Sequence, residues 1–183
     1  FIDEQRCVSS LDDTLRWYNY CNFNICPRRN DVTSGTYIDN NFICMDKERI
    51  EGFSKAFEPG EILRWEIPKT EKERTIFYED KYQALFEKKV TAVFAVSDFY
   101  ALEFMRFLQS KGIQIPKDIQ LIGFDDNIAS KESNPPLTTI HQESSLRAKT
   151  AIRCLEAMRD GAECKKEIVL PVELIKREST RKL

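Results

Sequence analysis

The chain has 183 residues, 42% of them hydrophobic, with a formal charge of −2 and a pI near 5.7. This length suits one domain, or one domain and part of another, and the hydrophobic share is enough for a core. The slightly acidic balance argues against nucleic-acid binding by this segment alone, because phosphate contacts need a basic surface. No apolar run is long enough to cross a membrane, and no signal peptide is visible.

The cysteines argue against a metal centre and against a disulfide framework. Their spacing is irregular, they form no CxxC pair, and one histidine, His141, is available as a nitrogen ligand. We therefore expect reduced thiols that pack as small hydrophobes in the cytosol, with neither metal nor cofactor. The six cysteines are Cys7, Cys21, Cys26, Cys44, Cys154 and Cys164.

Residues 1–48 carry the weakest pattern of the chain. Ser10 or Asp12 can cap a short helix over residues 11–20, whose aromatic side chains we expect in a core rather than on a stacking platform. Residues 26–40 are polar and rich in turn formers, so they predict a loop. We expect residues 22–42 to be poorly ordered.

Residues 46–88 predict a helix, a strand and a second helix. Asp46 caps the first helix, which ends at Pro59-Gly60, and residues 62–67 form a short strand. The second helix, over residues 73–88, places its apolar side chains on one stripe that should face the core. That stripe consists of Ile76, Phe77, Leu85 and Phe86.

The stretch 91–127 predicts one βαβ unit, around which the rest of the chain is organised. An apolar run at residues 92–96 is typical of a strand buried on both faces, and Ser97 or Asp98 can cap the following helix. That helix, over residues 99–111, ends at Gly112, and a second apolar strand follows at residues 119–124. We expect the two strands to be parallel and joined by a right-handed crossover.

Both strands of this unit end in polar residues. Since the carboxyl ends of strands in an open α/β sheet form the ligand crevice, we expect these polar tips to bind a small polar molecule. They are Ser97, Asp98, Asp125 and Asp126. One alternative is a hydrolase triad of Ser97, Asp98 and His141. Another is a metal or phosphoryl site at Asp125 and Asp126, although no P-loop, HExxH, GxSxG or GxGxxG motif supports an enzyme.

Beyond residue 127 the pattern changes to an extended segment, a helix and a final strand. Pro135-Pro136 favours an extended backbone at residues 137–140, and Ser144 or Ser145 can cap a helix over residues 146–159. Residues 168–175 predict the strand, in which a proline implies an edge position or a bulge. The helix carries one apolar stripe, Ala148, Ala151, Ile152, Leu155 and Met158.

The helix over residues 99–111 has two apolar stripes. One should face the sheet, and the other, made of Tyr100, Phe104 and Phe107, lies about 100° away around the helix. One sheet does not easily cover both stripes, so we predict that these three aromatic side chains are exposed and form a dimer interface. The alternative is that residues 4–45 fold back and cover the rings.

Four motifs of this chain occur together in one protein family. They are TAVFAVSD from residue 91, ALxxMxxLxxxGIxIPxDIxLIGFDD from residue 101, PPLTTIHQ from residue 135 and LPVELIKREST from residue 170. Together they resemble the effector-binding domain of the LacI/GalR family of bacterial transcription regulators, and residues 49–53 are similar to the family's RLxGF-type helix. The resemblance is specific over residues 90–183, fair over 46–90, and fades over residues 4–45, which look like an atypical insertion.

This resemblance implies an α/β fold, a parallel-sheet lobe of the periplasmic-binding-protein-like (flavodoxin-like) kind with helices on both faces. A sugar-sized effector would bind in a cleft between two lobes. Residues 1–138 would form the C-terminal lobe, residues 139–165 a crossover segment and a helix of the other lobe, and residues 166–183 a return strand and tail. The DNA-binding headpiece and most of the N-terminal lobe would be absent.

By motif match, the family's effector contacts fall on four polar residues, with a tryptophan as a stacking wall. The polar residues are Arg49, Ser97, Asp125 and Gln142, and the wall is Trp65. Charged side chains bond hydroxyls strongly, and an indole face covers the apolar side of a sugar ring. Ser97 stands where the family commonly has asparagine. Two alternatives stay open: Arg49 only balances a helix-start carboxylate, and Trp65 belongs to the core.

The resemblance therefore implies a ligand-sensing domain of a cytoplasmic transcription regulator, and not an enzyme. We expect a sugar or sugar derivative as effector, DNA contact only through the absent headpiece, no membrane contact, and a homodimer whose C-terminal lobes pair through the aromatic stripe. One rival is a periplasmic sugar-binding protein of a transport system, which has the same fold. The cysteines and the closing KREST segment favour the regulator. A second rival is an enzyme of flavodoxin-like fold, which the missing motifs disfavour.

Overall fold

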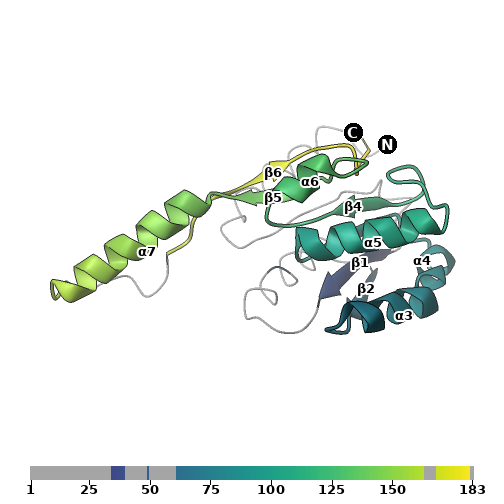
Figure 1. Ribbon diagram of the computed structural model, residues 1–183, viewed down its shortest axis with the longest axis horizontal. Coiled ribbons are helices and arrows are strands. Elements are labelled where there is room, and N and C mark those ends of the chain that lie inside the picture. The colour runs from purple at the N-terminus through teal and green to yellow at the C-terminus, as the bar shows by residue number, and fades with distance from the viewer. Residues whose placement is uncertain (1–33, 40–48, 50–60, 163–167, 182–183) are drawn as a thin grey trace.

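The structure is a computed structural model that describes residues 34–39, 49, 61–162 and 168–181. Its centre is a four-stranded parallel sheet in the order β2-β1-β3-β4 (Figure 1). The strands are β1 (Ser34–Asp39), β2 (Glu61–Glu66), β3 (Ala92–Ala95) and β4 (Gln120–Ile122). A second, two-stranded antiparallel sheet consists of β5 (Thr139–Gln142) and β6 (Val172–Ile175).

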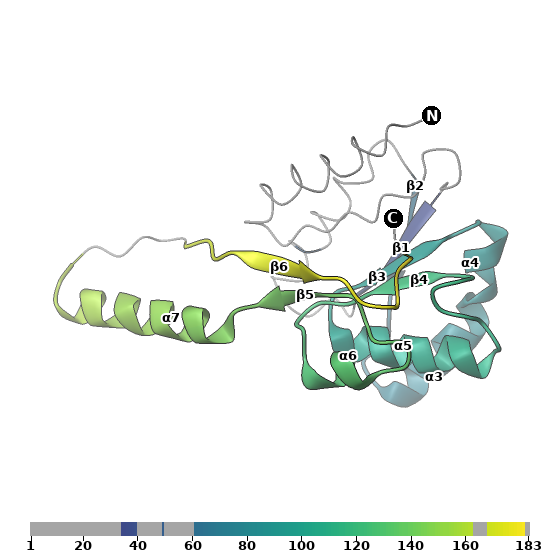
Figure 2. The same cartoon turned by 90° about the horizontal axis from the view of Figure 1, so that it is seen from above.

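Helices α3 and α5 cover one face of the four-stranded sheet (Figure 2). The described helices are α3 (Glu71–Lys81), α4 (Gln83–Glu87), α5 (Asp98–Ser110), α6 (Ile128–Glu132) and α7 (Ser144–Arg159). Arg49 is helical, but the rest of the helix predicted at residues 46–57 lies outside the described residues. Helices on the opposite face of the sheet therefore stay a prediction. Within the described residues, no helix is both long enough and apolar enough to span a membrane.

The predicted βαβ unit is confirmed as β3, α5 and β4. The two strands are parallel, with Ala92 beside Gln120 in the register. Ser97 caps α5, since its hydroxyl accepts a hydrogen bond from the Phe99 amide at 3.3 Å. Gly112 follows the helix with a φ of +77°, a conformation that glycine adopts without steric cost.

Strand β1 corrects the prediction of a loop over residues 26–40. It lies between β2 and β3 and pairs with both in parallel, with Thr36 beside Leu63 on one side and Val93 on the other. Only three of its six residues are strand formers, so its local pattern is weak, and pairing with two distant strands decides its conformation. The remainder of the segment predicted to be poorly ordered lies outside the described residues.

The helix predicted over residues 73–88 is divided at Tyr82 into α3 and α4, and the stripe that faces the core agrees only in part with the predicted one. The prediction is right for Leu85, which is fully buried, and for Phe77, which packs against the core, but Ile76 and Phe86 are 61% and 41% exposed. The buried stripe consists of Arg74, Tyr78 and Leu85. These three residues share one helical face. The apolar pattern hid this face because one of its members is an arginine.

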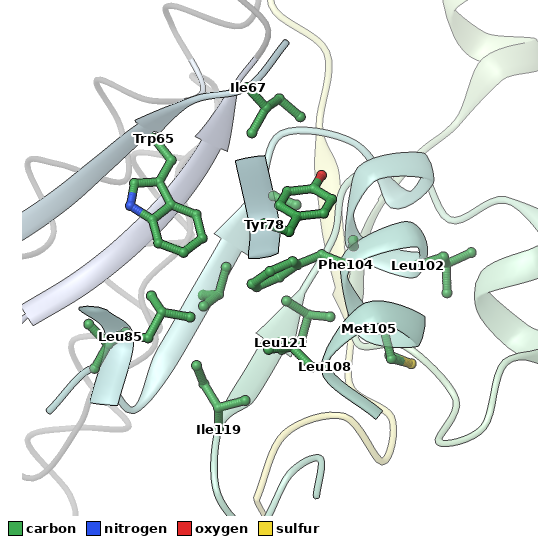
Figure 3. Packing of buried hydrophobic residues seen from close by; sticks show 14 of the residues in the cluster. Trp65, Ile67, Tyr78, Leu85, Leu102, Phe104, Met105, Leu108, Ile119 and Leu121 are labelled. Carbon is green, nitrogen blue, oxygen red and sulfur yellow. The ribbon is translucent and has the colours of Figure 1, made fainter. Parts of the chain in front are cut away.

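The main core lies between the sheet and α3 and α5, and aromatic rings fill much of it (Figure 3). Trp65 is 5% exposed and meets Phe77 and Phe104 edge to face, each with ring centroids 5.8 Å apart. Edge-to-face contacts of this kind add to the stabilisation from burial alone. Leu85, Leu108, Ile119 and Leu121 surround these rings and are fully buried.

The predicted aromatic dimer interface on α5 is wrong in its central residue. Phe104 is completely buried, and its ring lies 4.9 Å from that of Tyr78 on α3. Tyr100 and Phe107 are partly buried and pack against the same core. Helix α5 therefore uses one stripe against the sheet and the second against α3, so the rings are covered within the chain. Among the described aromatic residues of α5, Phe99 is the exposed one, at 58%.

Helix α7 projects away from the sheet and buries none of its residues against the described part of the chain (Figure 1). Its apolar side chains Ile152, Leu155 and Met158 are exposed. The helix begins two residues earlier than predicted, with Glu143 as its cap: the carboxylate accepts a hydrogen bond from the Ser145 amide at 3.1 Å. The antiparallel strands β5 and β6 connect this helix to the part of the chain that contains the four-stranded sheet.

The segment that follows β6 is hydrogen-bonded, through Ser179, to the edge of β4 that does not pair with β3. The Leu121 amide donates to the Ser179 carbonyl at 3.0 Å, and the Ser179 hydroxyl donates to the Leu121 carbonyl at 2.6 Å. The same hydroxyl oxygen accepts from the Thr138 amide at 2.8 Å. Buried polar groups of this segment are thus paired with the sheet.

Candidate ligand-binding site at the strand ends

Asp125 is the centre of a polar cluster at the carboxyl ends of the strands. Its Oδ2 accepts from the Ser97 hydroxyl and its Oδ1 from the Gln142 amide, each at 3.1 Å. The Arg49 Nη2 lies 3.7 Å from Oδ1. The four polar residues predicted as ligand contacts therefore lie together, and the Asp125 side chain remains 38% exposed.

Each member of the cluster is positioned by a different part of the fold. Ser97 caps α5 directly after β3, Asp125 follows β4, and Gln142 ends β5. The buried Arg49 donates from Nη1 to the Val96 carbonyl at 2.6 Å. Its guanidinium carbon lies 3.9 Å from the centre of the Phe124 ring, in cation–π geometry. Arg49 is therefore fixed from two sides and presents its charge to Asp125.

The side chains of the two consecutive aspartates point to different partners, although both backbones have a positive φ. Asp125 has a φ of +120° and Asp126 a φ of +53°, both in the left-handed half of conformational space. Asp126 is nearly buried and binds Arg177 and the His141 Nδ1, the latter at 3.0 Å. Within the described residues, no three His, Cys, Asp or Glu side chains are grouped to hold a metal. The two carboxylates therefore differ in role: Asp125 faces an exposed site, and the nearly buried Asp126 binds the largely covered cation Arg177.

The electrostatic surroundings of the two carboxylates differ accordingly. Burial raises the pKa of Asp125 above its ordinary value, and the charge of Arg49 and the hydrogen bond from Ser97 only partly oppose this. Burial also acts to raise the pKa of Asp126, but Arg177 and Lys131 outweigh it and hold that pKa below its ordinary value. Asp126 is therefore a firmly ionised partner of cations, while Asp125 has spare capacity to accept hydrogen bonds.

Asp98 is structural, and this removes the hydrolase triad. Its carboxylate is completely buried and accepts from the Thr139 hydroxyl and, at 2.9 Å, from the Asn127 amide. His141 bonds to Asp126 instead, and Ser97 to Asp125. No relay from a nucleophile through a histidine to a carboxylate exists among these residues. Asp98 instead holds the start of α5 against β5.

The wild-type protein should lose stability as the pH rises because Asp98 becomes charged, and replacing Asp98 with asparagine is expected to remove this loss. The pKa of Asp98 is raised from 3.8 to about 6, chiefly because burial disfavours the charged carboxylate. The folded protein therefore holds this proton more tightly than the unfolded chain. The stabilisation is complete below the unfolded pKa and is lost as the pH rises through the folded pKa.

Urea unfolding from about pH 4 to about pH 7 measures this effect. The difference in unfolding free energy between Asp98→Asn and wild type should move in favour of the variant as the pH rises. Asp118→Asn, in the exposed turn after α5, is the control for an Asp-to-Asn change as such. A difference that stays constant with pH would contradict the titration of Asp98 in this range.

Trp65 does not belong to the cluster, which corrects its predicted role as a stacking wall. Its indole is enclosed by Phe77 and Phe104 in the core between the sheet and the helices. Along β2, alternate residues point to opposite faces, and Trp65 points with Leu63 and Ile67 toward α3 and α5. The indole is therefore packed in the core and is not available to stack on a ligand.

Two arginines at the site escaped the sequence analysis. The Arg147 Nη1 donates to the Gln142 Oε1 at 3.3 Å from the first turn of α7, and its charge also acts on Asp125. Arg147 could have been predicted near the site, because it lies in the first turn of the helix that follows Gln142. Arg177 was seen only as part of a family motif, and nothing local indicates that it reaches Asp126 across 51 residues.

The chain has sequence relatives among bacterial repressors. Residues 41–180 match the periplasmic binding protein-like domain. The HTH-type transcriptional repressor PurR of Vibrio vulnificus is 34% identical over 142 residues, which cover 75% of this chain and 42% of that protein. PurR of Aliivibrio fischeri is also 34% identical, with 73% and 41% covered. The chain thus spans less than half the length of these curated relatives.

Solved structures show the same fold. A probable maltose operon repressor from Staphylococcus has a TM-score of 0.75 at 16% identity and covers 95% of this chain and 61% of that one. A LacI family regulator from Enterococcus faecalis with bound ribose has a TM-score of 0.68 at 27% identity, with 82% and 55% covered. The dimeric Lac repressor has a TM-score of 0.67 at 27% identity, with 81% and 55% covered.

Proposed function

Because the chain belongs to the periplasmic-binding-protein-like family, as the effector-binding domain of a LacI-type regulator, we propose that it senses a small hydroxylated molecule. Binding would occur at the Asp125 cluster and change the activity of a DNA-binding unit elsewhere in the protein. The observation that carries the proposal is the convergence of Ser97, Gln142 and Arg49 on one half-exposed carboxylate.

The chemistry of the cluster suits hydroxyl groups. A hydroxyl both donates and accepts, and the cluster offers a carboxylate as acceptor beside amide, hydroxyl and guanidinium donors. Hydrogen bonds to charged partners are also the stronger ones. The relative from Enterococcus faecalis holds ribose, so we propose a sugar or sugar derivative as the ligand class of this chain.

The projecting helix α7 supports a two-lobed arrangement. Its exposed apolar side chains need a cover, and we propose that a second lobe of the intact protein supplies it. Strands β5 and β6 would then be the connections between the lobes, and Gln142 and Arg147 would lie at the boundary. Closing of the lobes on a ligand would change the geometry that a DNA-binding unit and a dimer partner feel.

The proposal extends to a homodimer in the cytoplasm, as expected for a regulator that contacts DNA through another domain. One relative is a dimeric Lac repressor. The pairing surface must be sought elsewhere than at Phe104, because that ring is enclosed within the chain. Five of the six cysteines lie outside the described residues, so their predicted reduced state stays a prediction.

A periplasmic transport protein is the second candidate, since it shares the fold. The curated relatives are transcriptional repressors, which favours regulation over transport and over catalysis. The sequence preceding Phe1 in the intact protein separates the two candidates. A helix-turn-helix there supports the regulator, whereas a signal peptide would overturn it.

Replacing Asp125 with alanine is expected to weaken binding of the cognate ligand by about 1.5–3 kcal/mol, the range for hydrogen bonds to a charged group. The ligand is first found by a thermal-shift screen of sugars, beginning with D-ribose, on the intact protein. Calorimetry then compares wild type with Asp125→Ala. Asp80→Ala removes an exposed carboxylate on α3 and should bind as wild type. Equal affinity of Asp125→Ala and wild type would show that Asp125 does not contact the ligand.

A further inference from the structure

The turn that carries Asp125 has an unfavourable backbone. Two consecutive non-glycine residues, Asp125 and Asp126, have φ values of +120° and +53°. Such conformations cost energy and persist only where the surrounding structure holds them. Some contact must therefore keep this turn in place. The Asp125 amide donates to the Ile140 carbonyl at 2.9 Å, which holds its backbone against β5, but the side chain of Asp125 is exposed.

The side chain of Asp126 supplies a strong attachment. It is almost completely buried and binds the Arg177 guanidinium, the His141 Nδ1 at 3.0 Å and, at 3.6 Å, the Lys131 ammonium. Its amide also lies 3.4 Å from the Thr139 hydroxyl. Charge-assisted bonds in a buried setting resist reorientation.

Arg177 is itself immobilised by three further hydrogen bonds. Its amide donates to the Thr138 hydroxyl at 2.9 Å. Its Nη1 donates to the Leu137 carbonyl at 2.8 Å and to the Ser130 hydroxyl at 3.1 Å. The guanidinium is therefore a fixed part of the lobe and not a surface side chain that happens to reach Asp126.

We propose that Arg177 is a positioning residue for the ligand site: by fixing Asp126, it holds the turn that directs the Asp125 carboxylate toward Ser97 and Gln142. The relevance to a ligand rests on the proposed function, but the geometry does not. Arg177 follows β6 and His141 lies in β5, so residues from both connecting strands meet at the Asp126 carboxylate, and β5 also binds the Asp125 amide through the Ile140 carbonyl. A shift in the connections would therefore be felt at Asp125.

Hydrogen exchange of the intact protein tests the positioning without any ligand. In Arg177→Ala, amides of residues 123–127 should exchange about tenfold faster or more, as expected for the loss of a charged hydrogen bond. Amides of β3 should be unaffected. The matched control is Arg181→Ala, because Arg181 also ties this segment to the lobe, through the Pro116 and Lys117 carbonyls, without touching Asp126.

The proposal is overturned if residues 123–127 exchange as in wild type, or if Arg181→Ala loosens them equally. Arg177→Lys keeps the charge but not the fork of donors, and should restore part of the protection. If Arg177→Ala yields no folded protein, Asp126→Asn carries the same test. D-ribose and the other screened sugars are then titrated into each variant. If Asp125→Ala leaves their binding unchanged, the proposed function fails, whereas the exchange result still decides the role of Arg177.

Discussion

Replacing Phe104 with alanine is expected to lower the free energy of unfolding by about 3–5 kcal/mol. The ring is completely buried and contacts three other aromatic rings, those of Trp65, Tyr78 and Phe107. Its removal leaves a cavity between the sheet, α3 and α5, because rigid secondary structure on each side limits collapse. Equilibrium unfolding in urea, followed by circular dichroism, measures the loss.

Phe99→Ala is the matched control, since this ring lies on the same helix but is mostly exposed. It should change stability by less than about 1 kcal/mol, as is usual at the surface. The pair of variants also separates a core from an interface. If Phe104→Ala kept its stability but dissociated a dimer in light scattering, the ring would lie between two chains and the packing described here would be wrong.

Replacing Glu103 with alanine is expected to lower the free energy of unfolding by about 3–5 kcal/mol, because it leaves the buried charge of Arg74 without its partner. The Arg74 guanidinium donates to both oxygens of Glu103, from Nε at 2.7 Å and from Nη2 at 2.6 Å. The Tyr78 hydroxyl donates to the same carboxylate at 3.1 Å. The hydrogen bonds that Arg74 donates to Glu103 raise the pKa of Arg74, whereas the pKa of Tyr78 is raised first by burial and then by the charge of Glu103.

The lost stability of Glu103→Ala should come mainly from the buried charge of Arg74, which has lost its partner, and not from a favourable net energy of the ion pair. The double variant Arg74→Met with Glu103→Leu should therefore recover most of the stability, since apolar residues of similar volume often replace a buried pair without loss. Glu79→Ala breaks the exposed pair with Lys111 and should cost less than about 1 kcal/mol. A double variant as unstable as Glu103→Ala would contradict this account.

The central unit and the polar cluster were predictable because their signals are local. An apolar run that ends in Ser97, and another that ends in Asp125, indicate where two parallel strands stop. The rule for α/β sheets then brings these ends to one edge. Arg49 and Gln142 were placed there only through the family resemblance, since neither lies in a local pattern that indicates a site.

What escaped prediction depends on contacts between segments far apart in the chain. Phe104 was assigned to the surface because the helical wheel of α5 shows two stripes but not the second helix that covers one of them. The prediction for that helix, α3, also missed part of its buried face, because that face includes Arg74. A search for apolar stripes passes over an arginine, and only the partner of Arg74 on α5, Glu103, makes its burial possible.

The attachment of Ser179 to β4 also affects the order in which the lobe is completed during synthesis. Strand β4 has β3 on one side, and on its other side Thr138 and Ser179, which are synthesised after it, bond to Gly123 and Leu121. Until these emerge from the ribosome, the edge of a hydrophobic strand offers unpaired backbone groups to any neighbouring chain. A nascent or truncated polypeptide that lacks these residues would therefore expose this strand edge, and exposed edges of this kind favour aggregation.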